Sequence, residues 1–458
     1  MNIRDMQENY IKSNKVLLRR RQKDIIRIKQ LIWLYFYLLI FEGALRKWVL
    51  PGMSNLLLII RDPVALYILF LAFRNGWLRN NYIVSMVVVS GIGFFSALLF
   101  GHGNPVVALY GLRITLIHFP LIFIIGRVFN KQDVLRVGTV LLWLSLPMMI
   151  LNAFQFYTPQ SSWFNRGVGG DMAGAGFGGA LGYFRPPGTF SFTNGNVLFW
   201  NLTGAYVFYG WLSRERFNRN LLIVASVALF GAVAFSISRT LVFQLGLTGI
   251  FVLFALARKP GYFSRVVVGI VAVALAAFVL SNLPVFHTGL HAFEVRFEQA
   301  TTSEGHGSVS KNIIDRMILG GMVNALTQST ELPFWGYGLG MGTNAGAKIL
   351  TGKTLFLISE GEWGRLLGEC GLLLGLAMIL IRVALSFKML RNSYVAMTRG
   401  NVLPWILLSV GLVNILQGPW AQPTSLGFAI FIGGLVLASG QSVKRLKSKK
   451  ELKKIGSK

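Results

Sequence analysis

Long apolar runs, separated by short polar connections, occupy the chain from about residue 31 to residue 440. Runs of about twenty residues with few charges are typical of helices that cross a lipid bilayer. The pattern predicts an all-α polytopic membrane protein with about twelve transmembrane helices. The predicted spans are 31–45, 55–73, 82–100, 105–126, 134–157, 192–212, 220–237, 240–257, 264–284, 363–381, 402–418 and 424–440.

Two connections are too long to be simple turns. The Gly-rich segment 158–191 follows the fifth predicted span, and the segment 285–361 lies between the ninth and the tenth. Loops of this length are usually functional or disordered, and few acidic repeats or low-complexity charges appear in these two. We therefore expect ordered caps at these places, with transmembrane helices at 31–284 and 362–440 on either side of the larger loop.

The basic residues predict the orientation in the membrane. The chain has a net charge of +28, although only 14% of its residues are charged. Lys and Arg concentrate in an N-terminal arm at 1–30, a tail at 441–458 and every second connection. This positive-inside pattern predicts that both tails are cytoplasmic and that the two long loops face outward. The distribution favours contact with anionic membrane lipid and argues against nucleic-acid binding.

Three charged residues lie where the bilayer makes them costly, at roughly 2.5–3.5 kcal/mol for a central arginine. Arg61 and Asp62 are neighbours in the second predicted span, and a buried ion pair that fixes helix packing would explain them. Arg113 has no acid near it in the sequence. It either lines a cavity, reaches the membrane surface or pairs with a distant acid.

Two arginines are predicted at the outer membrane boundary. Arg185 precedes two prolines and Gly188 just before the sixth span, and these residues fix the backbone. Arg239 follows a very short turn and begins a helix, where free N–H groups and the helix dipole favour an anion. Both positions suit a phosphate, and the alternative for each is an anchor in the lipid headgroups.

Acidic residues surround the start of the tenth predicted span. Glu362, Arg365 and Glu369 have spacings that place them on one helix face, and Glu360 precedes them. An intrahelical ladder of ion pairs would explain the three. The acids are also candidates for a general base.

The sequence predicts no metal site. His287 and His291 are four residues apart, with Glu294 nearby, but no further ligand set accompanies them. A surface helix explains them. The segment from Gly338 to Gly342 has no strand before it, so a dinucleotide-binding interpretation is weak.

Four segments resemble, in order, motifs of the O-antigen ligase/polymerase superfamily, the membrane enzymes that finish bacterial surface polysaccharides. They are Arg185–Phe190 with Asn194, the turn Ser238-Arg239, Arg316 followed by Pro333–Gly340, and Trp363 with Glu369 and Gly371–Gly375. The resemblance covers roughly residues 105–440. The chain departs from the family at Glu360-Gly361, where the family commonly has His-Asn.

The resemblance implies a glycosyltransferase of the bacterial inner membrane. Its donor would be an undecaprenyl-diphosphate-linked oligosaccharide and its acceptor a sugar hydroxyl, without cofactor or metal. Polysaccharide assembly and export proteins would be further partners. Arg185, Arg239 and Arg316 would bind the donor diphosphate, Arg239 also acting in catalysis, and Glu360 or Glu362 would be the base. The substrate cavity would include Arg113, Asn194, Arg365 and Glu369.

Other functions remain open at this stage. The missing histidine favours an O-antigen or exopolysaccharide polymerase, while a ligase that transfers the glycan to a lipid or other final acceptor is the alternative. A transporter or lipid-linked glycan flippase would also explain charges within the membrane. Such a protein is expected to show paired broken helices and substrate charges at mid-bilayer.

Overall fold

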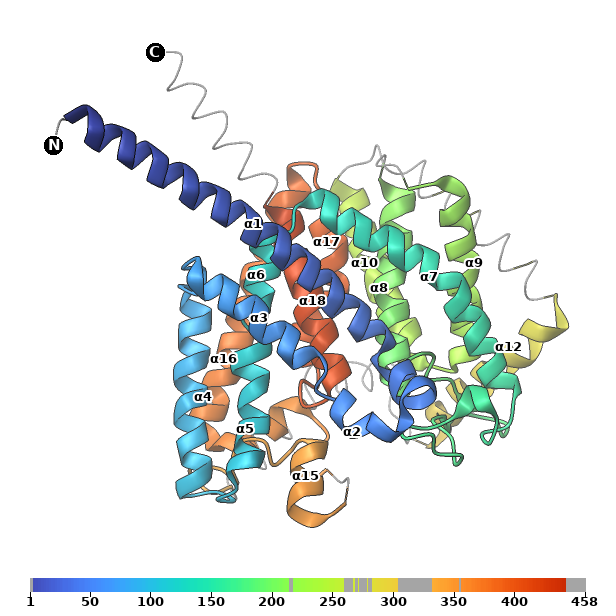
Figure 1. The fold of residues 1–458 in the computed structure, drawn as a ribbon. Helices are drawn as coiled ribbons and strands as arrows, with labels where there is room; N and C mark the ends of the chain where they lie inside the picture. The colour runs from blue at the N-terminus through green and yellow to red at the C-terminus, as the bar shows by residue number, and fades with distance from the viewer. Residues whose placement is uncertain are drawn as a thin grey trace.

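The computed structural model describes residues 3–213, 217–258, 282–303, 332–353 and 356–441, together with single helical residues at 267, 271 and 278. Helices dominate these residues, and two short strands form one antiparallel hairpin (Figure 1). The elements are α1 Ile3–Ala44, η1 Leu45–Val49, η2 Pro51–Met53, α2 Ser54–Leu57, α3 Arg61–Arg74, α4 Asn81–Leu99, α5 Pro105–Arg113, η3 Ile114–His118, α6 Leu121–Val128, α7 Lys131–Tyr157, η4 Trp163–Asn165, β1 Phe177–Gly178, β2 Phe184–Arg185, α8 Thr193–Leu212, α9 Arg219–Ser236, α10 Arg239–Arg258, α12 Pro284–Ser303, α15 Asn344–Thr351, α16 Glu362–Thr398, α17 Leu403–Leu416 and α18 Pro423–Gly440.

Nine helical segments of the described residues are long and apolar enough to cross a membrane. They are Arg19–Val49, Pro51–Arg74, Asn81–Leu99, Pro105–Val128, Lys131–Tyr157, Arg219–Ser236, Arg239–Arg258, Glu362–Thr398 and Pro423–Gly440. Each overlaps a predicted span, so the prediction of a mostly helical chain with many spanning helices is confirmed. Predicted spans 192–212 and 402–418 correspond to α8 and the shorter α17, whereas most of 264–284 lies outside the described residues.

α18, at the centre of the bundle, is buried along almost its whole length. α18 packs most extensively against α6 and α17, and it also contacts α8 (Figure 1). Its side chains at Phe428, Phe431 and Leu435 are fully buried. α4, in contrast, leaves Phe95 and Leu99 largely exposed. Apolar exposure of this kind on a spanning helix fits contact with lipid, because lipid tails are as apolar as the side chains.

α16 is interrupted at Gly371, whose backbone has φ 71° and ψ 176°. A Cβ at this position would lie 2.0 Å from the carbonyl oxygen of Phe334, so only glycine fits. The Gly-rich segment after Phe334 adds backbone hydrogen bonds to the same helix, with Tyr337 N donating to Gly368 O and Gly338 N to Glu369 O. These glycines therefore allow close backbone packing beside α16, which explains the segment without a dinucleotide.

The charges within the predicted spans are paired between helices. Arg61 donates to Glu42 of α1 at 3.0 Å, and Asp62 lies 3.1 Å from Arg113 and 3.0 Å from His118. The adjacent Arg61 and Asp62 thus form two separate ion pairs, which corrects the expectation that they pair with each other. Arg113 has the distant acidic partner that was one of its three interpretations. These pairs join α1, α3 and the helix formed by α5 and η3.

Candidate functional site

Arg185 lies on a hairpin that an aromatic cluster holds against three helices. The hairpin pairs Phe177 with Arg185. Tyr183 stacks on Phe156 of α7 with ring centroids 4.4 Å apart, and Phe156 contacts Phe235 of α9 at 5.7 Å. Phe235 in turn lies 5.1 Å from Phe286 of α12. Packing of these rings fixes the hairpin relative to α7, α9 and α12.

The backbone after Arg185 is fixed by buried polar side chains. Gly188 has φ 61°, and its N–H donates to Gln155 Oε1 at 2.8 Å. The carbonyl oxygen of Gly188 accepts from Lys47 Nζ at 2.7 Å, while Asn196 Nδ2 donates to Pro186 O at 3.0 Å. The segment is therefore attached to η1, to α7 and to α8. The sequence-based expectation of a rigid backbone here agrees with these contacts.

Arg239 begins α10 directly after a tight turn. Ile237 at the end of α9 has φ 44°, and Ser238 Oγ accepts from Leu241 N at 3.4 Å in the first turn of α10. The Ser238 side chain is buried. The turn thus brings Arg239 to the N-terminal end of a helix, as the spacing predicted, where the helix dipole favours negative charge.

Two other arginines act on Arg185 at this place. Burial lowers the pKa of Arg185, and the positive charges of Arg296 and Arg239 lower that pKa further. Arg185 Nε is buried and has no hydrogen-bond partner among the described residues. Arg296, on α12, donates to Gly179 O of the hairpin at 3.1 Å. Clustered cations whose charges disfavour one another are stabilised by an anion, so the arrangement suits a phosphate.

Sequence reasoning missed Arg296. Its helix carries apolar side chains at Phe286, Leu290, Phe293 and Phe297, which recur at helical spacing. That stripe could have predicted an amphipathic helix lying on the bundle, with Arg296 beside its apolar face. Only the tertiary packing shows which loop this arginine faces.

A second charged group lies inside the bundle at the start of α16. Arg365 donates to Glu362 at 2.9 and 3.0 Å and to Glu369 at 2.6 Å. Arg382, one helix segment further along, donates to Glu362 at 2.6 Å and lies 3.8 Å from the centre of the Trp420 ring. All four charged side chains are buried. Arg382 was not singled out from the sequence, because its partner is 20 residues away in the chain.

These contacts favour the structural interpretation of Glu362, Arg365 and Glu369. Glu362 also accepts from the backbone N–H of Trp420 at 3.1 Å, and Glu369 accepts from Gly342 N at 2.8 Å. A carboxylate that accepts several charged and backbone donors is stabilised as an anion and is a poor proton acceptor. The structure therefore gives Glu362 a packing role in place of the expected base.

Glu360 differs from Glu362 in its surroundings. It is exposed and lies two residues before α16, outside the buried cluster. Asn194, expected in the substrate cavity, donates to Gln422 at 3.2 Å and to Ser425 at 2.8 Å. The connection between α17 and α18 therefore contacts both α8 and, through Trp420, the start of α16. This places the N-terminal ends of α8 and α16 around one connection.

Other expected site residues lie apart from the arginine group or beyond the described residues. Arg113 forms its ion pair with Asp62. Arg316 falls in 304–331, outside the described residues. His287 and His291 are exposed on α12, and the described part of the chain contains no group of three His, Cys, Asp or Glu side chains able to hold a metal.

No protein-family model matches the chain, and comparison with curated proteins finds no match either.

Proposed function

We propose that this protein is a glycosyltransferase of the bacterial inner membrane, with about twelve spans and both termini in the cytoplasm. It would transfer a glycan from undecaprenyl diphosphate to an acceptor sugar hydroxyl at the outer face. The observation that carries the proposal is the group formed by Arg185, Arg239 and Arg296. The order of sequence segments that resemble the O-antigen ligase/polymerase superfamily supports the choice of donor.

The reaction requires charge stabilisation more than any other contribution. The acceptor oxygen forms a bond to the anomeric carbon, while the bond from that carbon to the phosphate oxygen breaks. The electron pair leaves with the diphosphate, and guanidinium groups fixed beside it stabilise the growing negative charge. Because the donor is already activated, the proposed reaction requires no nucleotide and no resident metal.

Glu360 is the better candidate for the base that takes the acceptor proton. It is exposed, while the buried Glu362 is occupied by Arg365, Arg382 and the Trp420 N–H. A base must reach the proton that it removes, and a carboxylate enclosed by donors cannot do so. Glu360 also stands where the resembling family commonly has a histidine, so the two side chains would have the same task.

Substitution of the arginines tests the proposal. Arg185→Ala is expected to lower glycan transfer by about 10²–10³-fold, the loss found when one donor to a developing oxyanion is removed. Arg185→Lys should recover little activity, because an ammonium cannot make the forked contact of a guanidinium. Lys348→Ala is the matched control, since Lys348 is exposed on α15 and outside the arginine group.

The assay uses purified full-length protein in detergent with an undecaprenyl-diphosphate-linked oligosaccharide, and product is measured by chromatography. Wild-type turnover without a sealed membrane separates a transferase from a flippase, which would produce no new bond. Wild-type rates for the properly folded Arg185→Ala protein would refute the assignment.

Polymerase and ligase are distinguished in cells. We propose the polymerase, because Glu360 replaces the histidine that is common in ligases of the resembling family. Deletion of the gene should then remove long glycan chains from gels of surface polysaccharide, while single repeat units remain attached. Loss of all transfer to the final acceptor would instead indicate a ligase.

A further inference from the structure

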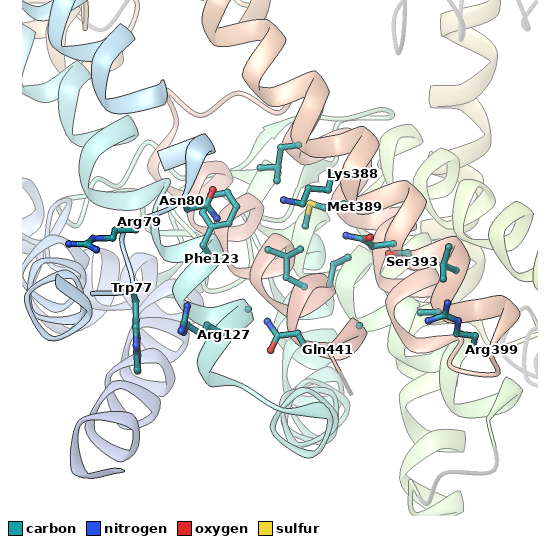
Figure 2. A pocket seen from close by; sticks show the side chains of 18 residues that line it. Trp77, Arg79, Asn80, Phe123, Arg127, Lys388, Met389, Ser393, Arg399 and Gln441 are labelled. Carbon is teal, nitrogen blue, oxygen red and sulfur yellow. The ribbon is translucent and has the colours of Figure 1, made fainter. Parts of the chain in front are cut away.

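A cavity of about 310 Å³ lies at the end of the bundle opposite the arginine group. Its walls come from the connection between α3 and α4, from α6, from the second part of α16 and from the end of α18 (Figure 2). α18 begins beside Asn194 and ends at this cavity. A helix of 18 residues is roughly 27 Å long, which is about the thickness of the hydrocarbon layer. The two sites therefore belong to opposite membrane boundaries.

Basic side chains surround the opening of this cavity. Figure 2 shows Arg127 on α6 and, at the hollow's other side, Lys388 on α16 and Arg399 at the C-terminal end of that helix, with Arg79 on the outer edge. All four are exposed, and no acidic residue lines the cavity. In the described part of the chain, no salt bridge involves any of them. Among the described residues, the opening therefore carries positive charge without an acidic partner.

Aromatic faces orient two of these cations. The Arg127 guanidinium lies 5.4 Å from the centre of the Trp77 ring, and Lys388 Nζ lies 4.7 Å from that of Tyr82. Contacts of this kind hold a cation in place and leave its N–H groups free to meet an anion. These contacts thus position the two cations at the opening.

The floor of the cavity is apolar. Leu385 and Met389 are completely buried, and Val436 is 3% exposed. Next to Lys388, Phe387 is 68% exposed on α16, on a surface that lipid would cover. A ligand that fits both parts needs an anionic head for the opening and an apolar portion for the floor and the neighbouring surface.

We propose that this cavity binds one anionic glycerophospholipid of the surrounding leaflet. Its phosphate would lie between Arg127 and Lys388, with Arg399 further along the opening, and the upper part of an acyl chain would pass over Leu385 and Met389. Basic pockets between spanning helices bind lipid headgroups in this way. The volume is at the low end for ligand sites, so it would enclose the head and the start of the chains, with the rest in the bilayer. The proposal does not depend on the glycosyltransferase assignment.

Lipid retention by purified full-length protein tests the site. The protein is exchanged into detergent containing equal amounts of phosphatidylglycerol and phosphatidylcholine, and bound lipid is counted by native mass spectrometry. Wild type should retain phosphatidylglycerol in preference. Each of Arg127→Gln and Lys388→Gln should weaken that retention about fivefold, as expected for one cation near an anionic headgroup. Arg391→Gln is the matched control, because Arg391 is exposed on the same helix but outside the cavity.

A second variant tests the cavity without changing charge. Gly440 lines the cavity, and a Cβ there would meet no atom within 4 Å. Gly440→Phe should therefore fill the hollow, keep the fold and displace the lipid. Equal retention of the two lipids by wild type, or unchanged retention by both Gly440→Phe and Lys388→Gln, would overturn the proposal. Displacement of phosphatidylglycerol by millimolar glycerol phosphate would also overturn it, because the site would then recognise a free phosphate without a lipid chain.

Discussion

Replacing Glu362 with glutamine should destabilise the protein strongly, because it removes the anion shared by two buried arginines. Glu362 accepts from Arg365 and Arg382, and also from the Trp420 backbone N–H. Glutamine has nearly the same shape but carries no charge, and its amide NH₂ would face arginine donors. Arg365 would keep Glu369, whereas Arg382 would keep only the Ile415 and Gly418 carbonyls and the Trp420 ring.

The size of the effect follows from the charge that remains. Glu362, Glu369, Arg365 and Arg382 together are neutral, and Glu362→Gln leaves one uncompensated positive charge in the bundle. Breaking a buried pair by removing one partner costs about 3–5 kcal/mol. This is a large part of the roughly 5–15 kcal/mol by which folded proteins are stable. For a chain of 458 residues, a fall in the melting temperature of roughly 3–5 °C is therefore expected.

The assay is the thermal aggregation of detergent-solubilised protein, followed by size-exclusion fluorescence. Glu360→Gln is the matched control, because Glu360 is only two residues away but exposed. Its melting temperature should equal that of wild type, while its glycan transfer should fall if it is the base. If Glu362→Gln had the same melting temperature as wild type, the argument from buried charge would be refuted. Equal destabilisation by Glu360→Gln would show that the two carboxylates share one environment, against the structure.

Three further substitutions test the packing of the bundle. Gly371→Ala should prevent folding and abolish the monodisperse peak in size-exclusion chromatography, because the new Cβ would lie 2.0 Å from Phe334 O and the backbone has φ 71°. Gly246→Ala is the control: it should be neutral or stabilise the protein by up to about 1 kcal/mol, because a Cβ there meets nothing within 4 Å. A similar loss of the monodisperse peak for both variants would contradict this explanation. Asp62→Asn should lower the melting temperature by removing the acidic partner of Arg113, and an unchanged value would show that their 3.1 Å ion pair contributes little.

The sequence alone determined where the spanning helices lie. Apolar runs and their polar boundaries placed the predicted spans 82–100 and 424–440 within a residue or two of α4 and α18. This works because every backbone polar group inside a bilayer needs a partner, and a helix supplies it locally. The same local reasoning placed Arg239 at the beginning of a helix and put Glu362, Arg365 and Glu369 on one face.

The tertiary structure decided which charged side chains meet. Arg61 and Asp62 are adjacent in the chain, but they pair with different residues. Glu362 accepts from Arg382, and no pattern in the sequence predicted this contact. The contact of Arg296 with the hairpin that carries Arg185 likewise became visible only in the tertiary structure. An ion pair depends on a separation of a few ångströms, which helix packing sets between residues far apart in sequence. Periodicity along the chain reports which face of a helix is apolar, but not which neighbour that face will contact.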